Sequence, residues 1–314
     1  MKTKMLIVAG ATATGKSDVA AALALRLGGE VISADSMQVY RKMDIGTAKP
    51  TVAEMRGVPH HLIDALWPDE PYSAAIFQDM ARACAADIAA RGKIPIVCGG
   101  TGFYINALLY GTDFTETVTD EALRAELADF AAAHGQEALH TRLRGVDPDA
   151  ADAIHANNVR RVIRALEYHA QTGRRISEHN TEQRTQRAQT ADYDAEMFIL
   201  TRDRAALYDR IDRRVDNMLA QGLVDEVCGL VADGYTPGLP SMRGLGYKEI
   251  IRYLDGEYTL EEAVRILKRD TRHFAKRQCT WFAHQADAAA RFVCAGESVE
   301  ETGEQIMRLM AGNA

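Results

Sequence analysis

The chain has 314 residues, of which 47% are hydrophobic and 26% are charged, and its formal net charge is −7 at pH 7. No apolar run approaches the roughly 20 residues that a membrane span needs, so a membrane protein is excluded. The five cysteines are scattered, without C-x-x-C or Cys/His spacing, which argues against zinc and for reduced thiols. We therefore expect a cytoplasmic globular protein with one large α/β domain and room for an insertion.

The first motif in the chain is the most informative one. The apolar run Met5–Ala9 predicts a buried strand, and the Ala/Leu-rich stretch Asp18–Leu27 predicts a helix. The residues between them complete the pattern G-x-x-x-x-G-K-[ST]: Gly10, Ala11, Thr12, Ala13, Thr14, Gly15, Lys16 and Ser17. A strand, a glycine loop and a helix in this order indicate a P-loop. We predict that its amides and Lys16 bind phosphate and that Ser17 ligates Mg²⁺.

Strands and helices alternate after this motif. Apolar and amphipathic patterns predict strands at Val31–Ala34 and Ile94–Cys98 and helices at Ser73–Arg91 and Phe103–Leu109. Such alternation favours a parallel sheet with helices on both faces. Ligands bind beyond the carboxyl ends of such strands, so the P-loop, Asp35–Ser36 and Gly100–Thr101 should share one rim.

The alternation of predicted strands and helices ends near Asp113. Helices are predicted at 120–134, at 135–144, from Asp147 onward and at 157–172, whereas 177–192 is polar without apolar periodicity and is expected to be a mobile connector. An apolar run at 196–200 predicts a strand that returns to the sheet. Helices follow at 204–221, 223–233, 247–254 and 260–285, with a Gly/Pro-punctuated loop at 237–246.

The predicted fold class is therefore α/β, with a P-loop NTPase-like parallel sheet flanked by helices, a mostly helical insertion and a helical C-terminal part. We expect three segments. Residues 1–112 form the first part of the core, residues 113–190 form the insertion, and residues 191–314 return to the core and complete the helical C-terminal part.

Three short motifs allow more than one interpretation. Asp35 follows a strand and could coordinate magnesium, accept a proton from a nucleophile, or cap the following turn. Thr101 lies in Gly99–Gly102, which could be a second anion cradle or only a tight turn. His60 and His61 are adjacent and point apart on an extended segment, so packing and hydrogen bonding are expected rather than metal binding.

Two basic clusters interrupt the acidic composition. One contains Arg160, Arg161, Arg164, Arg174 and Arg175, and the other runs from Arg265 to Arg277 with only Asp270 opposing it. Each cluster could be a solvated helix face or a nucleic-acid contact, because local patches matter more than total charge. From the residues alone, a P-loop small-molecule kinase is the default hypothesis. The large basic C-terminal half fits that hypothesis poorly.

Eight motifs occur in the order typical of one family. They are Gly10–Ser17, Asp35–Tyr40, Met43–Pro50, Pro59–Leu62, Gly99–Tyr104, Arg164–Glu167, Arg243–Tyr247 and Ala275–Trp281. On these motifs the chain, up to about Phe282, resembles the tRNA isopentenyltransferase (tRNA dimethylallyltransferase) family in its bacterial form. The connector 174–192 and the tail after Phe282 do not match.

The resemblance implies an enzyme that transfers a dimethylallyl group from dimethylallyl diphosphate to the exocyclic amine of adenine at tRNA position 37. The P-loop would then hold the diphosphate with Mg²⁺. Asp35 would take the proton from the amine, Thr101 would bind the bridging oxygen, and Arg214 would contact the diphosphate.

The resemblance also implies contacts with the tRNA anticodon stem-loop. The residues expected to make them are Asp35, Ser36, Met37, Gln38, Arg124, Arg160, Arg161, Arg164, Arg243, Gly244, Lys248, Lys276 and Arg277. We expect a monomer. Two further alternatives are an adenylate isopentenyltransferase acting on free AMP, ADP or ATP, and an RNA-binding protein without catalysis, which would leave the P-loop, Asp35 and Thr101 unexplained.

Overall fold

The computed structural model describes residues 2–112, 120–187, 193–286 and 289–312. Its strands are β1 (Thr3–Gly10), β2 (Gly29–Ser33), β3 (His60–His61), β4 (Ile94–Gly99), β5 (Tyr193–Thr201) and β6 (Arg291–Cys294). Its helices are α1 (Lys16–Leu27), α2 (Ala74–Ala90), α3 (Gly102–Tyr110), α4 (Glu121–His134), α5 (Gln136–Val146), α6 (Pro148–Ala153), α7 (Val159–Thr172), α8 (Ile176–Arg187), α9 (Arg204–Ala220), α10 (Leu223–Ala232), α11 (Tyr247–Leu254), α12 (Leu260–Gln285) and α13 (Val299–Ala311).

The described strands form one sheet in the order β3-β2-β4-β1-β5-β6, and every pair in it is parallel. The order departs from chain order, so each connection crosses over through helical or loop segments. This confirms the predicted α/β fold with a parallel sheet flanked by helices.

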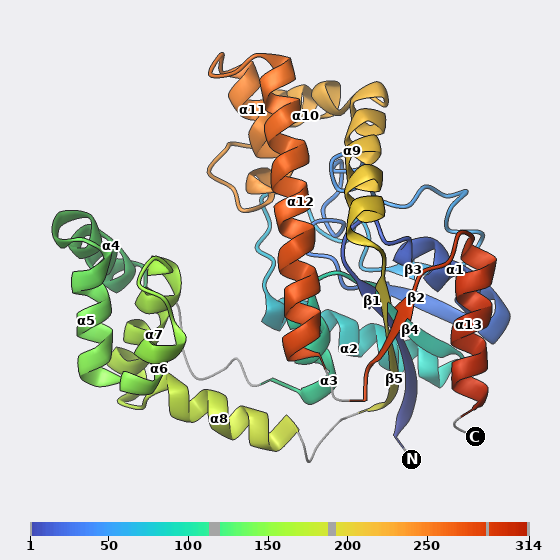
Figure 1. Ribbon diagram of the computed structural model, residues 1–314, viewed down its shortest axis with the longest axis horizontal. Helices are drawn as coiled ribbons and strands as arrows, with labels where there is room; N and C mark the ends of the chain where they lie inside the picture. Colours follow the sequence, from blue (N-terminus) through green and yellow to red (C-terminus); the bar gives the residue numbers. More distant parts are fainter. Residues whose placement is uncertain (1, 113–119, 188–192, 287–288, 313–314) are drawn as a thin grey trace. The chain divides into compact units, whose positions relative to one another are not determined.

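Both faces of the sheet are covered. Leu6 and Val8 of β1 belong to one apolar cluster with Val19 and Leu23 of α1 and Ile306 of α13. Side chains alternate along a strand, so the residues between them face the opposite side, where α2 packs on β2 and β4. Figure 1 shows α1 and α13 together on one side of the sheet, with α2 on the other.

The register of the strands places the predicted motifs on one rim. Ala9 pairs with Gly99, and Ser33 pairs with Cys98, so β1, β2 and β4 end at the same level. The P-loop, Asp35 and the loop Gly99–Thr101 follow these ends directly. The expectation of a shared rim is therefore confirmed.

The chain divides into two compact units. One comprises Met1–Leu109 and Asp192–Ala314 and contains the sheet, and the other comprises Tyr110–Ala191. The second unit contains α4 to α8, and Leu139 and Leu143 of α5 form its core with residues of α4, α6 and α7. The expected boundaries at Asp113 and after residue 190 fall in 113–119 and 188–192, outside the described residues.

One expectation about the segments 174–192 and after Phe282 was wrong. The polar stretch expected to be a connector contains α8, whose Ser177 donates its N–H and hydroxyl to Asp147 at 2.9 and 2.7 Å. That long-range contact, together with the packing of Ile176 against the apolar cluster of the insertion, anchors the start of the helix. The tail after Phe282 adds β6, which pairs with β5, and α13, which packs on α1.

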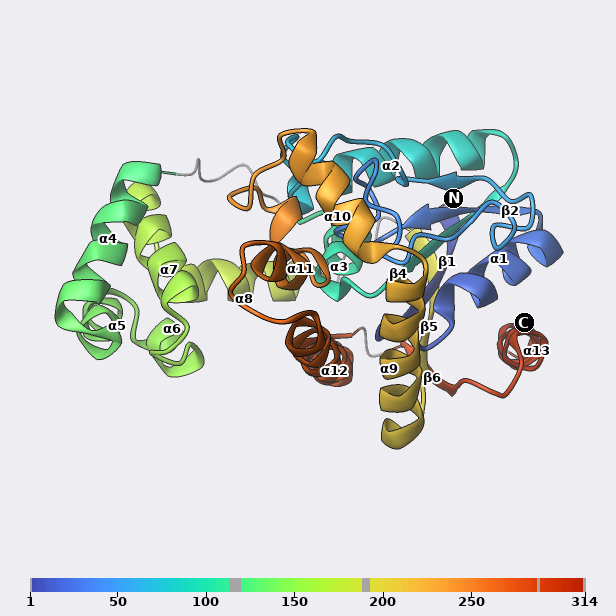
Figure 2. The ribbon, with the colours of Figure 1, turned by 90° about the horizontal axis from the view of Figure 1, so that it is seen from above.

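The C-terminal helices form an antiparallel group beside the sheet. α12 packs against α9 and α11, and both views of the ribbon show α9 and α12 as neighbours (Figures 1 and 2). The expected loop at 237–246 contains a short 3-10 helix, Ser241–Arg243. The segment Val39–Met43 packs into the apolar cluster of α10 and α11, which ties the residues after Asp35 to these helices.

The two histidines behave as expected. Nδ1 of His60 lies 2.9 Å from the Val58 carbonyl, and Nε2 of His61 lies 2.8 Å from the buried carboxylate of Glu30. The described residues hold no group of three or more His, Cys, Asp or Glu side chains arranged to hold a metal ion. No helix in the described part of the chain is both long and apolar enough to cross a membrane.

Candidate phosphate-binding site

The conformation of the P-loop depends on a glycine and on hydrogen bonds that two arginines donate to its carbonyl groups. Gly10 has φ +148°, and a Cβ there would lie 2.7 Å from the Leu200 carbonyl oxygen, so no side chain fits. Ala13 takes a left-handed φ of 63°, a conformation that is costly for an alanine. Arg210 of α9 donates to the Ala13 carbonyl at 2.9 Å, and Arg202 donates to the Thr14 carbonyl at 3.1 Å. These bonds direct carbonyl oxygens away from the anion side.

Two cations in this site, Lys16 and Arg214, are half-buried and have no hydrogen-bonded carboxylate among the described residues. Lys16 makes only a long contact, 3.5 Å, with the Ala11 carbonyl, and Arg214 of α9 makes no hydrogen bond to a described residue. Burial lowers the pKa of both groups, and the Asp35 carboxylate raises it in part. Partial desolvation of a cation without a hydrogen-bonded counter-ion is costly, so the pair forms a ready site for an anion.

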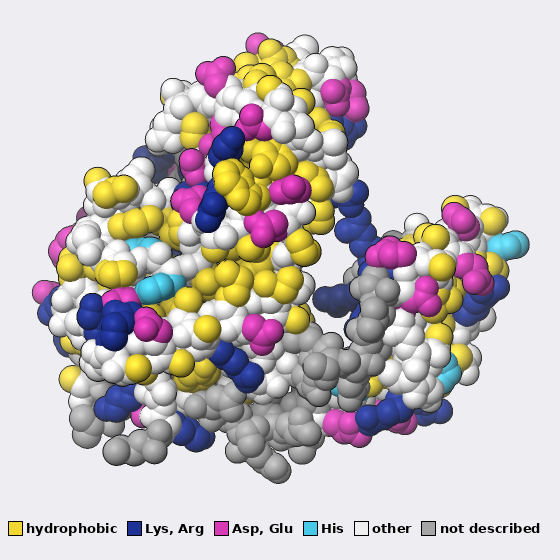
Figure 3. Space-filling model, turned by 180° about the vertical axis from the view of Figure 1, so that it is seen from behind, with side chains coloured by type: hydrophobic (Ala, Val, Ile, Leu, Met, Phe, Trp, Pro, Cys, Tyr) yellow, Lys and Arg dark blue, Asp and Glu magenta, His cyan; other side chains and the backbone are white. Residues whose placement is uncertain are grey.

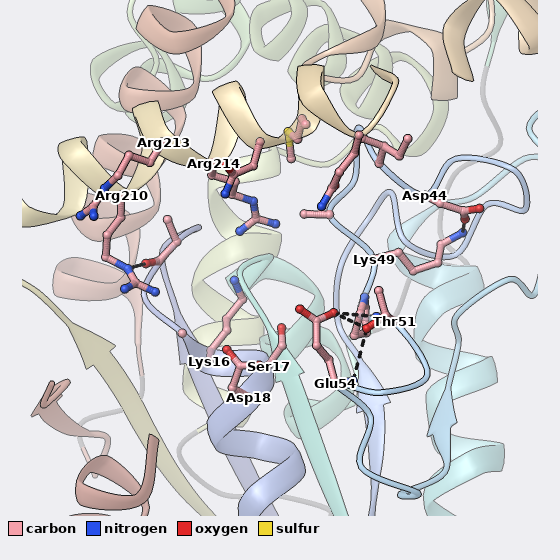
Figure 4. A pocket seen from close by; sticks show the side chains of 18 residues that line it. Lys16, Ser17, Asp18, Asp44, Lys49, Thr51, Glu54, Arg210, Arg213 and Arg214 are labelled. Atoms are coloured by element: carbon pink, nitrogen blue, oxygen red, sulfur yellow. Dashed lines mark hydrogen bonds and ion pairs between the residues drawn. The ribbon is translucent and has the colours of Figure 1, made fainter. Parts of the chain in front are cut away.

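A cavity of about 570 Å³ opens in front of the P-loop. Figure 4 shows Lys16 and Ser17 on one side of it and Arg210, Arg213 and Arg214 on the α9 side. Its other charged lining residues are Asp18, Asp44, Lys49 and Glu54. Burial, and secondarily the Glu54 carboxylate, raises the pKa of Asp18. The cavity therefore offers mainly positive charge near Lys16.

The loop along one edge of this cavity is fixed by a single carboxylate. Glu226 of α10 accepts the backbone N–H groups of Asp44, Ile45 and Gly46 at 2.7–3.0 Å, and it also accepts the Tyr247 hydroxyl at 2.7 Å. A Cβ on Gly46 would lie 2.6 Å from the Tyr247 ring. The loop is thus anchored to the C-terminal helices before any ligand binds.

Asp35 caps the turn that follows it, which is one of the three roles expected for this residue. Its Oδ1 accepts the N–H of Met37 at 2.9 Å and that of Gln38 at 3.3 Å. Oδ2 accepts no hydrogen bond from a described residue. A small crevice of about 20 Å³ joins Asp35 to Lys16, Ser17 and Cys98. The capping therefore fixes the carboxyl group while leaving one oxygen for chemistry.

The second glycine loop is a tight turn packed against Asp35's strand. A Cβ on Gly99 would lie 2.2 Å from the Ala34 carbonyl oxygen. Cys98, at the end of β4, is buried, and burial raises the pKa of its thiol to about 11, so it stays protonated. Thr101 precedes α3, and its hydroxyl makes no hydrogen bond to a described residue; it lines neither of the two spaces above.

The neighbours of Asp35 differ in what they can still bind. Gln38 is 9% exposed, and its amide accepts from Ser33 at 3.2 Å and donates to the carbonyls of Thr47 and Ala48 at 3.4 and 3.1 Å. Its side chain is therefore committed within the protein. Ser36 and Met37 are half-buried, and a Cβ on Gly244 would lie 2.5 Å from the Met37 methyl group.

Most basic residues of α12 are neutralised within the protein. Lys268 and Arg272 pair with Asp216 and Asp212 of α9, both at 2.6 Å, so the expectation of Asp270 as the sole opposing charge was wrong. Arg265 and Arg269 also have carboxylate partners. On the face in Figure 3, Lys and Arg side chains are interspersed with Asp and Glu.

A smaller set of basic residues remains exposed on this unit. Lys276 and Arg277 of α12 and Arg243 have no carboxylate partner in the described part of the chain, whereas Lys248 lies 3.4 Å from Glu249. The first three are therefore available to an anionic partner.

In the insertion, too, some basic residues form ion pairs with a carboxylate and others are exposed. Glu167 has no exposed side-chain surface and pairs with Arg124 at 2.8 Å and with Arg164 at 2.9 Å. Arg160 and Arg161, on the same helix α7, are exposed. Arg124 and Arg164 thus hold the unit together, whatever else they contact.

The cavity residues that were not singled out from the sequence include three on α9. Arg210, Arg213 and Asn217 lie with Arg214 on one face of α9. Their spacing of three or four residues was the available signal, since such residues share a helix face. Arg213 also pairs with Asp209.

These features define the class of protein. A P-loop flanked by two half-buried cations, with a capped carboxylate across a small crevice, has the geometry of a site that binds a phosphate-like anion.

Comparisons with known proteins identify the family. The model of the "IPP transferase" family matches residues 38–285, and the "Isopentenyl transferase" model matches residues 3–65. The tRNA dimethylallyltransferase of Lachnoclostridium phytofermentans is 52% identical over 283 residues, which cover 90% of each chain. That of Alkaliphilus oremlandii is 47% identical and covers 100% of this chain and 99% of its own. The chain belongs to the IPP transferase family.

Solved structures agree with this membership. The full-length tRNA isopentenylpyrophosphate transferase of Bacillus halodurans is 44% identical, with a TM-score of 0.73, over 99% of this chain and 96% of its own. A eukaryotic dimethylallyltransferase acting on tRNA is 30% identical, with a TM-score of 0.80, over 99% of this chain and 79% of its own. The expected family is therefore confirmed.

Proposed function

We propose that the protein transfers a dimethylallyl group from dimethylallyl diphosphate to the exocyclic amine of adenine at tRNA position 37. In this reaction the allylic carbon–oxygen bond breaks, a carbon–nitrogen bond forms, the amine loses a proton and diphosphate leaves. The relatives that act on tRNA support the substrate class. The observation that carries the proposal is the pair of half-buried cations at the P-loop, Lys16 and Arg214, which line the cavity without a hydrogen-bonded carboxylate among the described residues.

The diphosphate lies against the P-loop in this proposal. The P-loop amides other than that of Thr12, together with the N-terminus of α1, bind phosphate oxygens, and Lys16 and Arg214 neutralise the charge that grows as the carbon–oxygen bond breaks. Their desolvation strengthens this effect, because the local dielectric constant is low. Thr101 supplies its unused hydroxyl to the bridging oxygen of the leaving group.

A magnesium ion fits this arrangement as part of the substrate. The described residues hold no three-carboxylate cage, and Mg²⁺ typically keeps waters and phosphate oxygens among its ligands. Ser17 Oγ would hold the ion, which would supply further neutralisation of the diphosphate.

Asp35 accepts the proton of the amine. Its Oδ1 is held by two backbone N–H groups, so Oδ2 is the oxygen that faces the nucleophile. The adenine must leave the anticodon stack, at a cost of a few kcal/mol, before its amine can reach this oxygen. Ser36 and Met37 border the base, and Gln38 acts on it through the shape of the turn.

The anticodon stem-loop binds to exposed basic residues of each unit. Arg160 and Arg161 serve in the insertion, and Arg243, Lys276 and Arg277 serve in the other unit. Arg124, Arg164, Gly244 and Lys248 complete this set as residues that shape the surface. Binding should depend strongly on salt despite the acidic total charge. We propose a cytoplasmic, monomeric enzyme.

A transfer assay tests the proposal. Purified protein with Mg²⁺ and labelled dimethylallyl diphosphate should label an unmodified tRNA that has adenine at position 37, and not the same tRNA with guanine there. Asp35→Asn should lower kcat about 10²-fold or more and leave tRNA binding unchanged. Labelling of free AMP without labelling of tRNA would support an adenylate isopentenyltransferase instead, and phosphate release from ATP without tRNA would support a kinase.

A further inference from the structure

We propose that Gln278 of α12 is a positioning residue that fixes the spacing between the P-loop and the Gly99–Thr101 loop. It would thereby let the enzyme hold both ends of the departing diphosphate at once. The inference rests on the proposed function, since it assigns the P-loop and Thr101 to the same leaving group.

The side chain of Gln278 bridges the two loops directly. It is 8% exposed, its Oε1 accepts the N–H of Thr12 at 2.8 Å, and its Nε2 donates to the Gly100 carbonyl at 2.9 Å. A carboxamide is suited to this bridge, because it presents an acceptor and a donor on one planar group. An ionised glutamate lacks the donor, and methionine lacks both strong groups.

The contact is too close to accommodate much movement. A Cβ on Gly100 would lie 2.3 Å from Gln278 Nε2 and 3.2 Å from the Gly10 carbonyl oxygen. One turn later on α12, the Trp281 ring covers Gly102, where a Cβ would lie 1.9 Å from it. Ala275, one turn earlier, packs with Ala11 and Ala13. Side chains within two turns of one helix therefore set the position of both loops.

The bridge also has an electrostatic effect on the site. The hydrogen bond from Nε2 holds the Gly100 carbonyl oxygen toward α12, so that its negative dipole end does not face the diphosphate. The bond to Oε1 satisfies the Thr12 N–H, which is consequently directed to the protein rather than to the ligand. The remaining amides of the P-loop are left to the anion.

Two substitutions separate positioning from simple packing. Gln278→Met keeps the length and removes both bonds, and Gln278→Glu keeps the acceptor, removes the donor and adds charge. The matched control is Gln285→Met in the last turn of α12, where the side chain makes no hydrogen bond to a described residue. All three proteins are first compared by thermal unfolding.

We expect Gln278→Met to lower kcat/KM for dimethylallyl diphosphate about 10²-fold, since misplacement by about 1 Å can cost that much, with tRNA affinity changed by less than about twofold. Binding of inorganic diphosphate with Mg²⁺, measured by calorimetry, should weaken as well. The Gln285→Met control should match the wild type in both. A Gln278→Met protein with wild-type kcat/KM and wild-type diphosphate affinity would overturn the inference.

The pH dependence of Gln278→Glu gives a readout that packing alone would not move. A protonated glutamic acid restores the donor, so the diphosphate affinity of this variant relative to wild type should rise as pH falls. A ratio that does not change with pH would also overturn the inference. If the wild type binds diphosphate but labels no tRNA, the proposed function fails while the binding measurements still test Gln278.

Discussion

The same residue type serves opposite purposes in the two units. In the insertion, Arg124 and Arg164 both form ion pairs with a fully buried carboxylate, Glu167, which thereby has its counter-charge within the protein. In the sheet-containing unit, Arg214 and Lys16 are half-buried with no carboxylate hydrogen-bonded to them among the described residues. The first arrangement is complete without a ligand. The second is complete only when an anion binds, and this difference separates a structural cluster from a site.

The largest expected effect follows from removing Arg214, one of the two P-loop cations without a hydrogen-bonded carboxylate. Arg214→Met should lower kcat/KM for dimethylallyl diphosphate about 10³-fold, as removal of one charge-stabilising donor does elsewhere. It should not destabilise the unliganded protein, because it removes a partly desolvated charge that has no hydrogen-bonded carboxylate. Steady-state kinetics and urea unfolding together check this. Arg124→Met, the matched change in the insertion, should lower the stability and leave kcat/KM for dimethylallyl diphosphate nearly unchanged. A loss of stability in Arg214→Met would contradict the comparison.

The pH dependence of the unliganded site has a defined sign. Burial lowers the pKa of Lys16 below its ordinary value, so the unfolded chain binds a proton that the folded one binds less well. Lys16 therefore lowers stability at neutral pH, and this effect diminishes as pH rises through the folded-state pKa. Lys16→Met should remove that dependence, which urea unfolding across the alkaline range would detect.

A smaller effect on stability is expected when the cluster of Glu167, Arg124 and Arg164 is broken. Burial opposes ionisation of Glu167, but hydrogen bonds from Arg124, the Asp120 N–H and Arg164 lower its pKa overall. Its contribution to stability is therefore present above the unfolded pKa of about 4.3 and is lost as pH falls through the folded value. Glu167→Gln should cost about 2 kcal/mol, less than a fully buried pair because both arginines can be rehydrated.

Amide hydrogen exchange in α4 and α7 measures this cost locally. Glu126→Gln, an exposed position on α4, is the control and should leave the exchange rates unchanged. Protection of α4 and α7 in Glu167→Gln equal to that in the wild type would show that the cluster does not stabilise the insertion.

Local patterns predicted the rim well because its signals are local. The P-loop spacing, the apolar runs of β1 and β4, and the uninterrupted helical pattern of α12, which begins after the N-cap Thr259, all lie within short windows of sequence. Parallel strands then bring their carboxyl ends together without further information. The shared rim of the P-loop, Asp35 and Gly99–Thr101 follows from these alone.

The elements that were missed depend on partners distant in the sequence. β6 has only four residues, with Phe292 exposed, so its pattern is too short to indicate a strand before β5 pairs with it. α8 is polar after Ile176, and its start depends on Asp147, 30 positions from Ser177. The Asp212 and Asp216 partners of α12, and the Gln278 bridge to Thr12 across 266 positions, are likewise visible only after folding.

The smallest expected effect concerns the exposed cations, which neither cluster contains. If Lys276 and Arg277 bind phosphates of the tRNA, each change to alanine should weaken tRNA binding severalfold and reduce the magnitude of the salt slope of log K by about 1. Arg265→Ala on the same helix is the control, because Arg265 already pairs with Glu262 at 2.6 Å. Filter binding over a range of salt concentrations measures the slopes. Equal slopes for Arg277→Ala and Arg265→Ala would mean that exposure without a carboxylate partner does not mark an RNA contact on this helix. The contrast between cations with and without a carboxylate partner would then hold only for those at the P-loop and around Glu167.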